Sequence, residues 1–328
     1  MEVTNHTPIP VTLLTGFLGA GKTTLLNRII QQHPEKRFAI IENEFGDVSI
    51  DHELVVELED CIFELSNGCI CCTLNDGLTD TLVKLIKRKH DFDHLLIETT
   101  GVAEPDGIAT TFLSHPDVQK HFRLDATICL ADATADPALY FQEEEALRQI
   151  SFADSILLNK QSQASDEAKN ALIETIRSIN SLADIHPCDF GKVDFNLLDL
   201  QAYAPTTLAE KLERSTANGH HHNHTDLKSH SFVIDQPFDL IKIRHWLNVL
   251  LMVQRAQIYR VKGILNVQFQ DHRSILQSVR QSHVFTQGDA WAEDEHRVSK
   301  LVIIGKGIDP KMLDRALRSC LYRNPFPV

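Results

Sequence analysis

A glycine-rich segment near the start of the chain carries the most specific chemistry in the sequence. Residues 16–23 read GFLGAGKT and fit the pattern G-x-x-x-x-G-K-[ST]. In such a loop the backbone N–H groups surround an anion, the lysine reaches the β- and γ-phosphates of a nucleotide, and the following hydroxyl ligates Mg²⁺. The pattern predicts a nucleotide site that comprises Gly16, Gly19, Ala20, Gly21, Lys22, Thr23 and Thr24.

Such a site also needs an acidic residue, and the segment 94–101, HLLIETTG, supplies one. An apolar strand that ends in a carboxylate is typical of the Walker B motif, in which the acid holds the Mg²⁺ shell. Glu98 occupies that position, and the amide of Gly101 is placed to sense a γ-phosphate. Taken alone, Glu98 is also explained as a surface charge at a strand end. Next to the phosphate loop, it is predicted to act with Lys22 and Thr23 in catalysis and with Thr23 in Mg²⁺ binding.

The base of the nucleotide has its own candidate residues after the apolar run 155–158. Asn159 and Lys160 begin the pattern N-K-x-D, whose aspartate accepts hydrogen bonds from the N1–H and the exocyclic amine of guanine. The fourth position is Ser162, and loss of a carboxylate acceptor costs about 1.5–3 kcal/mol of guanine preference. Asp166 is an alternative acid, although it is expected to start a helix. GTP is the predicted nucleotide, and the serine keeps adenine open.

Three of the seven cysteines lie within four positions, at Cys69, Cys71 and Cys72. Closely spaced thiolates are soft ligands that suit Zn²⁺, with Co²⁺ or Ni²⁺ as further candidates. A redox pair and buried structural cysteines are the alternatives. Three thiolates, or two with a carboxylate, leave a tetrahedral metal one ligand short, which suits transfer of the ion. The nearest carboxylates are Glu42 and Glu44, and Glu42 is either a ligand or a solvated charge at a strand end.

A histidine-rich segment supplies a second set of metal-binding side chains. Five of the 17 histidines fall within eleven positions, at His220, His221, His222, His224 and His230. Imidazoles at this density bind Zn²⁺ or Ni²⁺ weakly and reversibly. An internal expression tag is the alternative, but Asn223 interrupts the run, which also lies between the predicted domains. We predict a flexible linker that collects metal.

Composition limits the classes of protein to which these residues can belong. The 328 residues are 43% hydrophobic and 23% charged, which is the mixture of a globular chain with a real core. A net charge of −13 argues against binding to nucleic acid or to an anionic membrane. An odd number of cysteines, without a signal peptide or an apolar run long enough to span a membrane, predicts a cytoplasmic protein. The isolated cysteines are expected to be buried fillers: Cys61, Cys129, Cys188 and Cys320.

The periodicity of the first half of the chain predicts the elements that position these residues. Short apolar runs followed by amphipathic helices indicate a mostly parallel α/β sheet, with ligands at the carboxyl ends of the strands. Strands are expected at 9–15, 38–46, 61–68, 94–101, 126–133 and 155–160, and helices at 25–33, 78–90 and 166–180. The fold class is therefore a P-loop NTPase domain.

The pattern changes after about residue 204. We predict a P-loop domain over 1–214, the histidine-rich linker over 215–229, and a small C-terminal α+β domain over 230–328. Within that domain, the apolar runs and two helical patterns at 239–255 and 310–321 suggest the order β-α-β-β-β-α, as in ferredoxin-like folds. This domain is expected to contact a client protein or a second copy of the chain.

Four quoted motifs together resemble a known family. LLTGFLGAGKTTLLN, IENEFG, NGCICC and LLIETTGVAEP are similar to the CobW-type P-loop GTPases, and in particular to the YjiA-like members. The resemblance covers nearly the whole chain and implies a metallochaperone or metal insertase with slow, metal-modulated GTP hydrolysis. It implies that Cys71 and Cys72 with Glu42 are metal ligands, with Cys69 a further candidate. It also implies phosphate and Mg²⁺ roles for Lys22, Thr23 and Glu98, and base contacts for Asn159 and Lys160.

Three hypotheses for function follow from the motifs. The first is a metal carrier in which Mg-GTP completes the metal site and hydrolysis to GDP and phosphate releases the ion to a client metalloprotein. Metal and GTP must then strengthen each other's binding by the same factor. The second is a zinc buffer or sensor with incidental hydrolysis. The third is an ATP-dependent small-molecule kinase, which suits Ser162 but gives the cysteine cluster no role.

Overall fold

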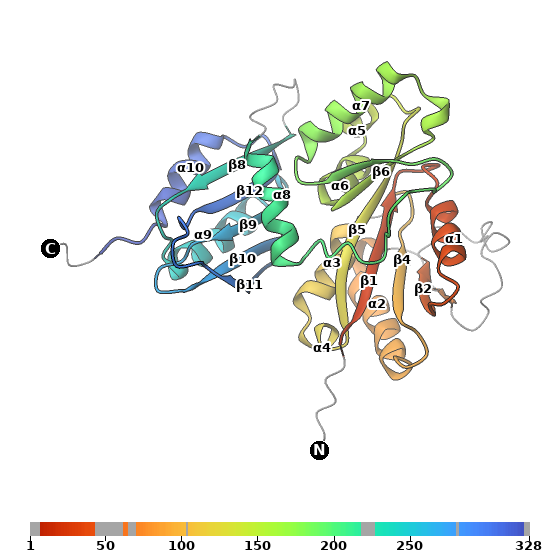
Figure 1. Ribbon diagram of the computed structural model, residues 1–328, viewed down its shortest axis with the longest axis horizontal. Helices are drawn as coiled ribbons and strands as arrows, with labels where there is room; N and C mark the ends of the chain where they lie inside the picture. Colours follow the sequence, from red (N-terminus) through yellow and green to blue (C-terminus); the bar gives the residue numbers. More distant parts are fainter. Residues whose placement is uncertain are drawn as a thin grey trace. The chain divides into compact units, whose positions relative to one another are not determined.

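The computed structural model describes residues 7–42, 62–64, 70–102, 104–217, 227–279 and 282–324 (Figure 1). Within these ranges only the backbone is described for 62–64, 70–77, 216–217 and 282. The chain divides into two compact units. The first runs to residue 176 and includes 183–203, and the second comprises 177–182 and 204–328.

The first unit is built on a seven-stranded sheet in which each neighbouring pair of strands is parallel. Its five inner strands are apolar runs that are largely buried on both faces, as is typical of parallel sheets. The order across the sheet is β3-β2-β4-β1-β5-β6-β7. The strands are β1 (Ile9–Gly16), β2 (Phe38–Glu42), β3 (Ile62–Glu64), β4 (His94–Glu98), β5 (Phe122–Asp132), β6 (Ser155–Asn159) and β7 (Asp184–Pro187).

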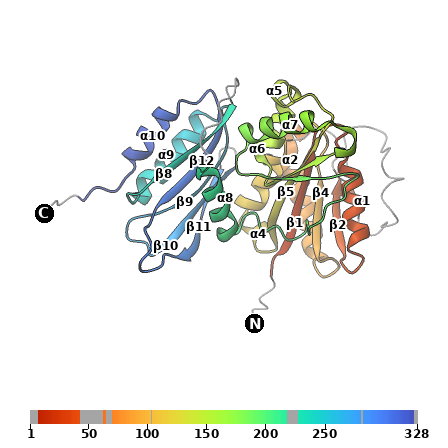
Figure 2. The same ribbon diagram turned by 45° about the horizontal axis from the view of Figure 1, so that its top comes forward.

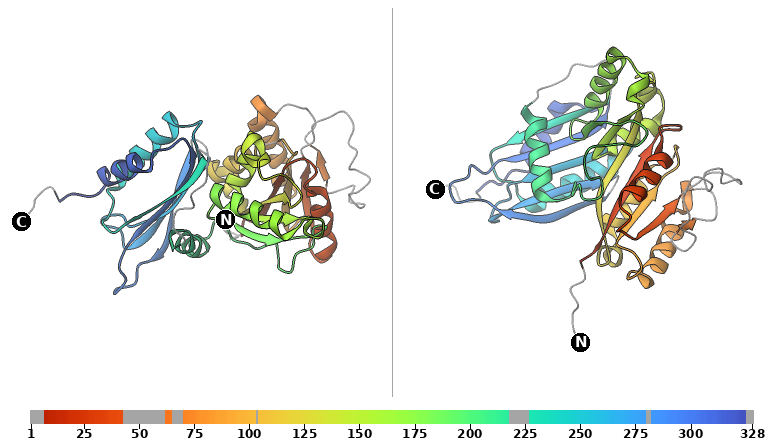
Figure 3. Two further views of the ribbon diagram at one scale, coloured as in Figure 1. Left: turned by 90° about the horizontal axis from the view of Figure 1, so that it is seen from above. Right: turned by 45° about the vertical axis from the view of Figure 1, so that its right-hand side comes forward.

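Helices cover the two faces of this sheet (Figures 2 and 3). Helix α1 (Lys22–Gln32) packs Leu25, Leu26 and Ile29 onto one face in a core that includes Leu14 of β1. Helices α3 (Pro105–Ser114) and α6 (Glu144–Phe152) contact β1 and β5 from the other face. The remaining helical segments of this part are α2 (Ile70–Lys87), α4 (Pro116–Gln119), α5 (Leu139–Gln142), the 3₁₀ turn η1 (Gln161–Gln163) and α7 (Asp166–Ile179).

The strand order reverses at β1, and this reversal places the phosphate loop. On one side of β1 lie β4, β2 and β3, which all precede β5 in the chain, and on the other side lie β5, β6 and β7. Because all strands are parallel, their carboxyl ends share one edge of the sheet. Ligands of open α/β sheets bind at this edge, next to the point of reversal. The predicted α/β class is confirmed, and the loop after β1 lies at that point.

Helix α2 begins earlier than expected. The sequence predicts a helix over 78–90, whereas α2 runs from Ile70 to Lys87. Helix α2 continues through Gly77, because a single glycine costs only about 1 kcal/mol inside a helix. The backbones of Cys71 and Cys72 therefore belong to the first turn of α2.

The second unit contains a five-stranded sheet in the order β11-β10-β9-β12-β8, with each neighbouring pair antiparallel. The predicted α+β class is confirmed, but the expected order β-α-β-β-β-α is one strand short. The run 275–287 forms two strands of a hairpin, because the chain turns back between Val279 and Ser282. The elements are β8 (Leu227–Ile234), α9 (Leu240–Val253), β9 (Ile258–Leu265), β10 (His272–Val279), β11 (Ser282–Ala290), β12 (Ser299–Lys306) and α10 (Pro310–Ser319).

Helix α8 (Pro205–Ala217) corrects the predicted domain boundary. Leu208 and Leu212 of α8 pack with Ile264 and Val302 on one face of the antiparallel sheet, while α9 and α10 pack on the other (Figure 3). A boundary after residue 214 would cut this helix, so the second unit resumes at residue 204. Among the described residues, no helix is long and apolar enough to cross a membrane.

Candidate functional site at the carboxyl edge of the parallel sheet

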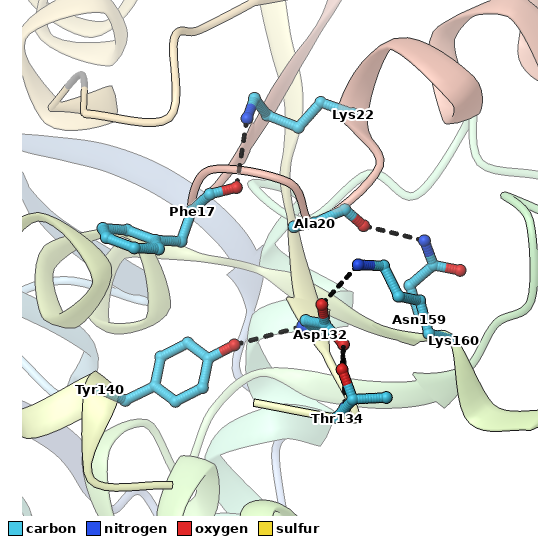
Figure 4. Close-up of polar contacts among 8 residues, drawn as sticks. All are labelled: Phe17, Ala20, Lys22, Asp132, Thr134, Tyr140, Asn159 and Lys160. Atoms are coloured by element: carbon cyan, nitrogen blue, oxygen red, sulfur yellow. Dashed lines mark hydrogen bonds and ion pairs between the residues drawn. The ribbon is translucent and has the colours of Figure 1, made fainter. Parts of the chain in front are cut away.

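The phosphate loop is shaped by glycines with left-handed backbone conformations. Gly19 has φ 74° and Gly21 has φ 101°, values that side-chain-bearing residues rarely adopt. A Cβ atom on Gly21 would lie 2.6 Å from Nδ2 of Asn159. Lys22 folds back over the loop, where its Nζ donates to the carbonyls of Gly16 at 2.9 Å and Phe17 at 3.4 Å (Figure 4). The loop therefore holds a nearly buried cation against its own carbonyls, ready to exchange them for phosphate oxygens.

Thr23 and Glu98 meet at the centre of this edge. The hydroxyl of Thr23 donates to Oε1 of Glu98 over 2.9 Å, although 75 residues separate them. Glu98 ends β4, where it lies opposite Leu14 of β1 in the register. A hydroxyl and a carboxylate side by side are the hard oxygen donors that suit Mg²⁺. The two residues predicted from separate motifs thus form one oxygen-lined position beside the loop.

Gly101 lies against the phosphate loop itself. A Cβ atom at this position would come within 2.8 Å of the backbone nitrogen of Leu18 and 2.5 Å of a methyl group of the same residue. The carbonyl of Gly101 accepts a hydrogen bond from Nε2 of Gln149 in α6 at 3.0 Å. The segment after Glu98 is therefore held in contact with the loop, which is the placement needed by an amide predicted to respond to the γ-phosphate.

The base side of the edge is assembled from β5, β6 and the loop. Nδ2 of Asn159 donates to the carbonyl of Ala20 at 2.8 Å, which ties the end of β6 to the phosphate loop (Figure 4). Lys160 has φ 60°, and its Nζ reaches Oδ2 of Asp132 at 2.6 Å. Asp132 also accepts from the hydroxyl of Thr134 at 2.6 Å. The Lys160 and Thr134 hydrogen bonds hold the pKa of Asp132 below its usual value, although partial burial opposes the shift.

The sequence analysis missed Asp132. It ends the apolar run 126–132 as Glu98 ends its own run, so the rule that identified Glu98 also applies to it. Asp132 lies beside Asn159 in the register of β5 and β6. The sequence alone did not show that β5 and β6 are neighbours, and that adjacency makes Asp132 a partner of Lys160.

Asp166, the alternative acid for the fourth position of N-K-x-D, has an exposed side chain. Asp166 begins α7, its side chain is 89% exposed, and it forms an ion pair with Lys169 at 3.2 Å. Ser162 lies in the turn η1, where its backbone N–H donates to Oδ1 of Asp189 at 3.4 Å. The structure therefore pairs Asp166 with Lys169 at the surface, and places the carboxylate of Asp189 at the backbone of Ser162.

The transition-metal site is described only in part. Glu42 ends β2 and lies opposite Glu98 of β4 in the register. Cys71 and Cys72 lie in the first turn of α2, and their side chains are outside the description. Among the described residues, no three His, Cys, Asp or Glu side chains group as metal ligands. Several predicted ligands lie outside the described residues: Cys69, His220, His221, His222 and His224.

The other histidine of the run and the isolated cysteines have structural surroundings. His230 belongs to β8 and is buried, so it is part of the second unit and not of the segment 215–229 predicted as the linker. Cys129, Cys188 and Cys320 are buried free thiols, which agrees with their prediction as fillers. Burial raises the pKa of Cys188 to about 11, which keeps it a thiol at neutral pH. Cys61 lies outside the described residues.

The opposite end of β4 carries a buried histidine. Nε2 of His94 and the hydroxyl of Thr12 are 2.9 Å apart, and the ring packs edge-on to Phe38. Burial lowers the pKa of His94 to about 3, with further lowering by nearby cations such as Lys36. His94 is neutral at physiological pH and belongs to the core.

Comparison with known proteins follows the same division into two units. Residues 10–187 match the family CobW/HypB/UreG, nucleotide-binding domain, and residues 227–321 match the Cobalamin synthesis protein cobW C-terminal domain. The chain is 36% identical to the zinc chaperone YjiA of Escherichia coli over 91% of its length and 94% of that protein. It is 40% identical to the zinc-regulated GTPase metalloprotein activator 1 of Schizosaccharomyces pombe, over 60% of this chain and 50% of that protein.

A solved structure agrees over nearly the whole chain. The crystal structure of Zn(II)-bound YjiA GTPase from E. coli matches with a TM-score of 0.76 and 31% identity, covering 97% of this chain and all of that one. The match therefore includes both the parallel sheet with its phosphate loop and the antiparallel sheet. Because both domains match in sequence and the chain matches in fold, it belongs to the CobW/HypB/UreG family of nucleotide-binding proteins.

Proposed function

We propose that the chain hydrolyses GTP to GDP and phosphate with Mg²⁺, and that the state of the nucleotide controls its hold on a zinc ion destined for a client metalloprotein. The observation that carries this proposal is the register of β2 and β4. Glu42, the predicted zinc ligand, lies directly opposite Glu98, which accepts the hydrogen bond of Thr23. A change at the γ-phosphate therefore acts one strand away from the metal site.

The residues of the edge divide the chemistry between them. Lys22 gives up its contacts with Gly16 and Phe17 to bind phosphate oxygens. Thr23 and Glu98 would hold Mg²⁺, which supplies positive charge to the phosphates when bound. Loss of the γ-phosphate removes a contact near Gly101 and frees the segment that follows Glu98. Hydrolysis is expected to be slow unless a partner assists.

The names of the relatives support zinc as the cargo. YjiA is named a zinc chaperone, and its crystal structure is titled as Zn(II)-bound. A further YjiA structure carries alanine in place of one glutamate and two consecutive cysteines. Those three positions have the same spacing as Glu42, Cys71 and Cys72 in this chain. That triple mutant is itself titled as Zn(II)-bound, so the shared spacing identifies corresponding positions and does not by itself make Glu42 a zinc ligand.

The test is to separate zinc binding from nucleotide binding with Glu42→Gln. We expect Zn²⁺ affinity to fall about 10-fold or more, because a charged ligand becomes a weak neutral one, while GDP affinity stays within about twofold. Competition with a chromophoric chelator measures the first and fluorescent nucleotide titration the second. Glu35→Gln is the matched control, since Glu35 is exposed before the other end of β2. Unchanged Zn²⁺ affinity in Glu42→Gln would contradict the assigned ligand.

A further inference from the structure

The base side of the nucleotide site lacks the residue that normally reads guanine. An aspartate in N-K-x-D accepts from both the N1–H and the 2-amino group of the base, whereas the hydroxyl of Ser162 offers no charged pair of acceptors. If this chain distinguishes guanine, another carboxylate must reach the same place. The inference below rests on the proposed GTP-binding function and names the residue that gives it base specificity.

Three carboxylates are candidates for this role, and two of them have other partners. Asp166 is solvated and paired with Lys169. Asp132 accepts from Lys160 and Thr134, at 2.6 Å each. Asp189 is the third, and its Oδ1 is 3.4 Å from the backbone nitrogen of Ser162. The acid therefore stands at the fourth position of the motif, although it comes from another segment of the chain.

The loop that carries Asp189 is anchored between β6 and α1. The N–H of Cys188 donates to the carbonyl of Leu158 at 2.9 Å, one residue before Asn159. Gly191 packs so closely on α1 that a Cβ atom would lie 3.0 Å from Cα of Leu25. The N–H of Lys192 closes the turn on the carbonyl of Asp189 at 2.8 Å. Asp189 is thus held on a short turn between the base-reading strand and the helix that starts in the phosphate loop.

Two further observations mark this place as a ligand site. Asn159 is 3% exposed, and its Oδ1, on the side away from Ala20, has no hydrogen-bond partner in the structure (Figure 4). A buried acceptor without a partner costs about 1–3 kcal/mol, which a ligand donor would offset. Lys160 at φ 60° and Phe190 at φ 47° are two of the four described non-glycine residues with positive φ. Such strain clusters at binding sites, and these two residues flank the contact between Ser162 and Asp189.

We propose that the carboxylate of Asp189 reads guanine in place of the missing aspartate of N-K-x-D. Its two oxygens accept from the N1–H and the 2-amino group, and its hydrogen bond from the Ser162 backbone fixes its orientation. The serine stands in N-K-x-S, and the acid comes from the segment that follows β7. Adenine offers no N1–H and no 2-amino group, so Asp189 excludes it.

The test compares GDP with inosine diphosphate, which differs only by lacking the 2-amino group. In the wild-type chain, GDP is expected to bind about 10- to 100-fold more tightly, the worth of one hydrogen bond to a charged acceptor. In Asp189→Ala and Asp189→Asn this ratio should fall to within about threefold, mainly through weaker GDP binding. Because the phosphates are identical, inosine diphosphate binding shows that each variant is folded. Asp194→Asn, an exposed aspartate five residues later, is the matched control and should keep the wild-type ratio.

Each other outcome has a stated meaning. A wild-type preference for GDP that survives in both Asp189 variants would overturn the assignment and leave the proposed function standing. Loss of the preference in Asp166→Asn but not in Asp189→Asn would give the role to Asp166. Equal wild-type affinity for the two nucleotides would also overturn the assignment, as would an equal loss of both in the Asp189 variants. A wild-type chain that binds no nucleotide would overturn the proposed function itself.

Discussion

The phosphate side and the base side of one sheet edge are built in different ways. On the phosphate side, the loop is a contiguous stretch of eight residues, and its partner Glu98 comes from the neighbouring strand β4. On the base side, the contacts join three segments that are far apart in the sequence and lie at or just after the carboxyl ends of β5, β6 and β7. The phosphate side keeps the full motif, whereas the base side has a serine at its most selective position. A contiguous motif tolerates little substitution, but a site assembled from several strands can move a function from one segment to another.

The largest effect is expected on the phosphate side, as a loss of the rate of GTP hydrolysis. Lys22→Ala removes the cation that donates to the carbonyls of Gly16 and Phe17 in the loop. Charge-assisted contacts to a transferring phosphate are worth about 10²–10³ in rate. Phosphate release from GTP should therefore fall at least about 100-fold. Lys120→Ala is the control, because this lysine pairs with Asp117 at the surface. A Lys22 variant that retains a tenth of the wild-type rate would contradict this account of the loop.

A smaller effect is expected on the base side. Asp132→Asn removes the ion pair with Lys160. The side chain of Asp132 is 20% exposed and that of Lys160 is 32% exposed. Partial exposure screens the charges, so GDP affinity should fall only about three- to tenfold as Lys160 loses its position. Fluorescent nucleotide titration measures this change. Asp117→Asn disrupts a fully surface pair and should have no effect. A loss of GDP affinity of about 100-fold or more would contradict the modest role given to this ion pair.

The smallest effect on the nucleotide is expected at the far end of β4. His94 has a folded pKa of about 3, below its unfolded value near 6.5, so only the unfolded chain gains a proton as pH falls through this window. Because of this protonation, the free energy of unfolding should decrease by roughly 4–5 kcal/mol between pH 6.5 and 3. His94→Phe should flatten the decrease in urea unfolding and leave GDP affinity at pH 7 unchanged. His90→Gln, at the surface, should retain the wild-type slope.

The sequence predicted the phosphate side better than the base side for a physical reason. Residues 16–23 form their loop locally, and Glu98 is recognisable as the acid that ends an apolar run. Asp132 was missed because its role depends on the adjacency of β5 and β6. Asp189 was missed because it follows β7, a strand of only four residues, Asp184–Pro187, with weak apolar character. The periodicity of a sequence indicates where strands are, but the order of strands in a sheet depends on tertiary packing.

The same limit applies to the second unit and to α2. The hairpin of β10 and β11 appears in the sequence as one apolar run, because its turn contains no glycine or proline. Helix α8 was placed on the wrong side of a boundary because an amphipathic helix does not reveal which sheet it covers. The early start of α2 brings the backbones of Cys71 and Cys72 into its first turn, which the predicted range 78–90 did not include. The assigned roles of the cysteines and of the histidine run stay predictions.

The central claim is that the nucleotide controls zinc affinity, and one titration tests it directly. Zn²⁺ affinity of the full chain is measured at a fixed Mg²⁺ concentration with a non-hydrolysable GTP analogue, with GDP, with an ATP analogue and without nucleotide. We predict an increase of about tenfold or more with the GTP analogue alone, and by linkage an equal increase of GTP-analogue affinity in saturating Zn²⁺. Equal Zn²⁺ affinity in all four conditions would contradict the account and leave a zinc-binding protein whose metal site is independent of its nucleotide.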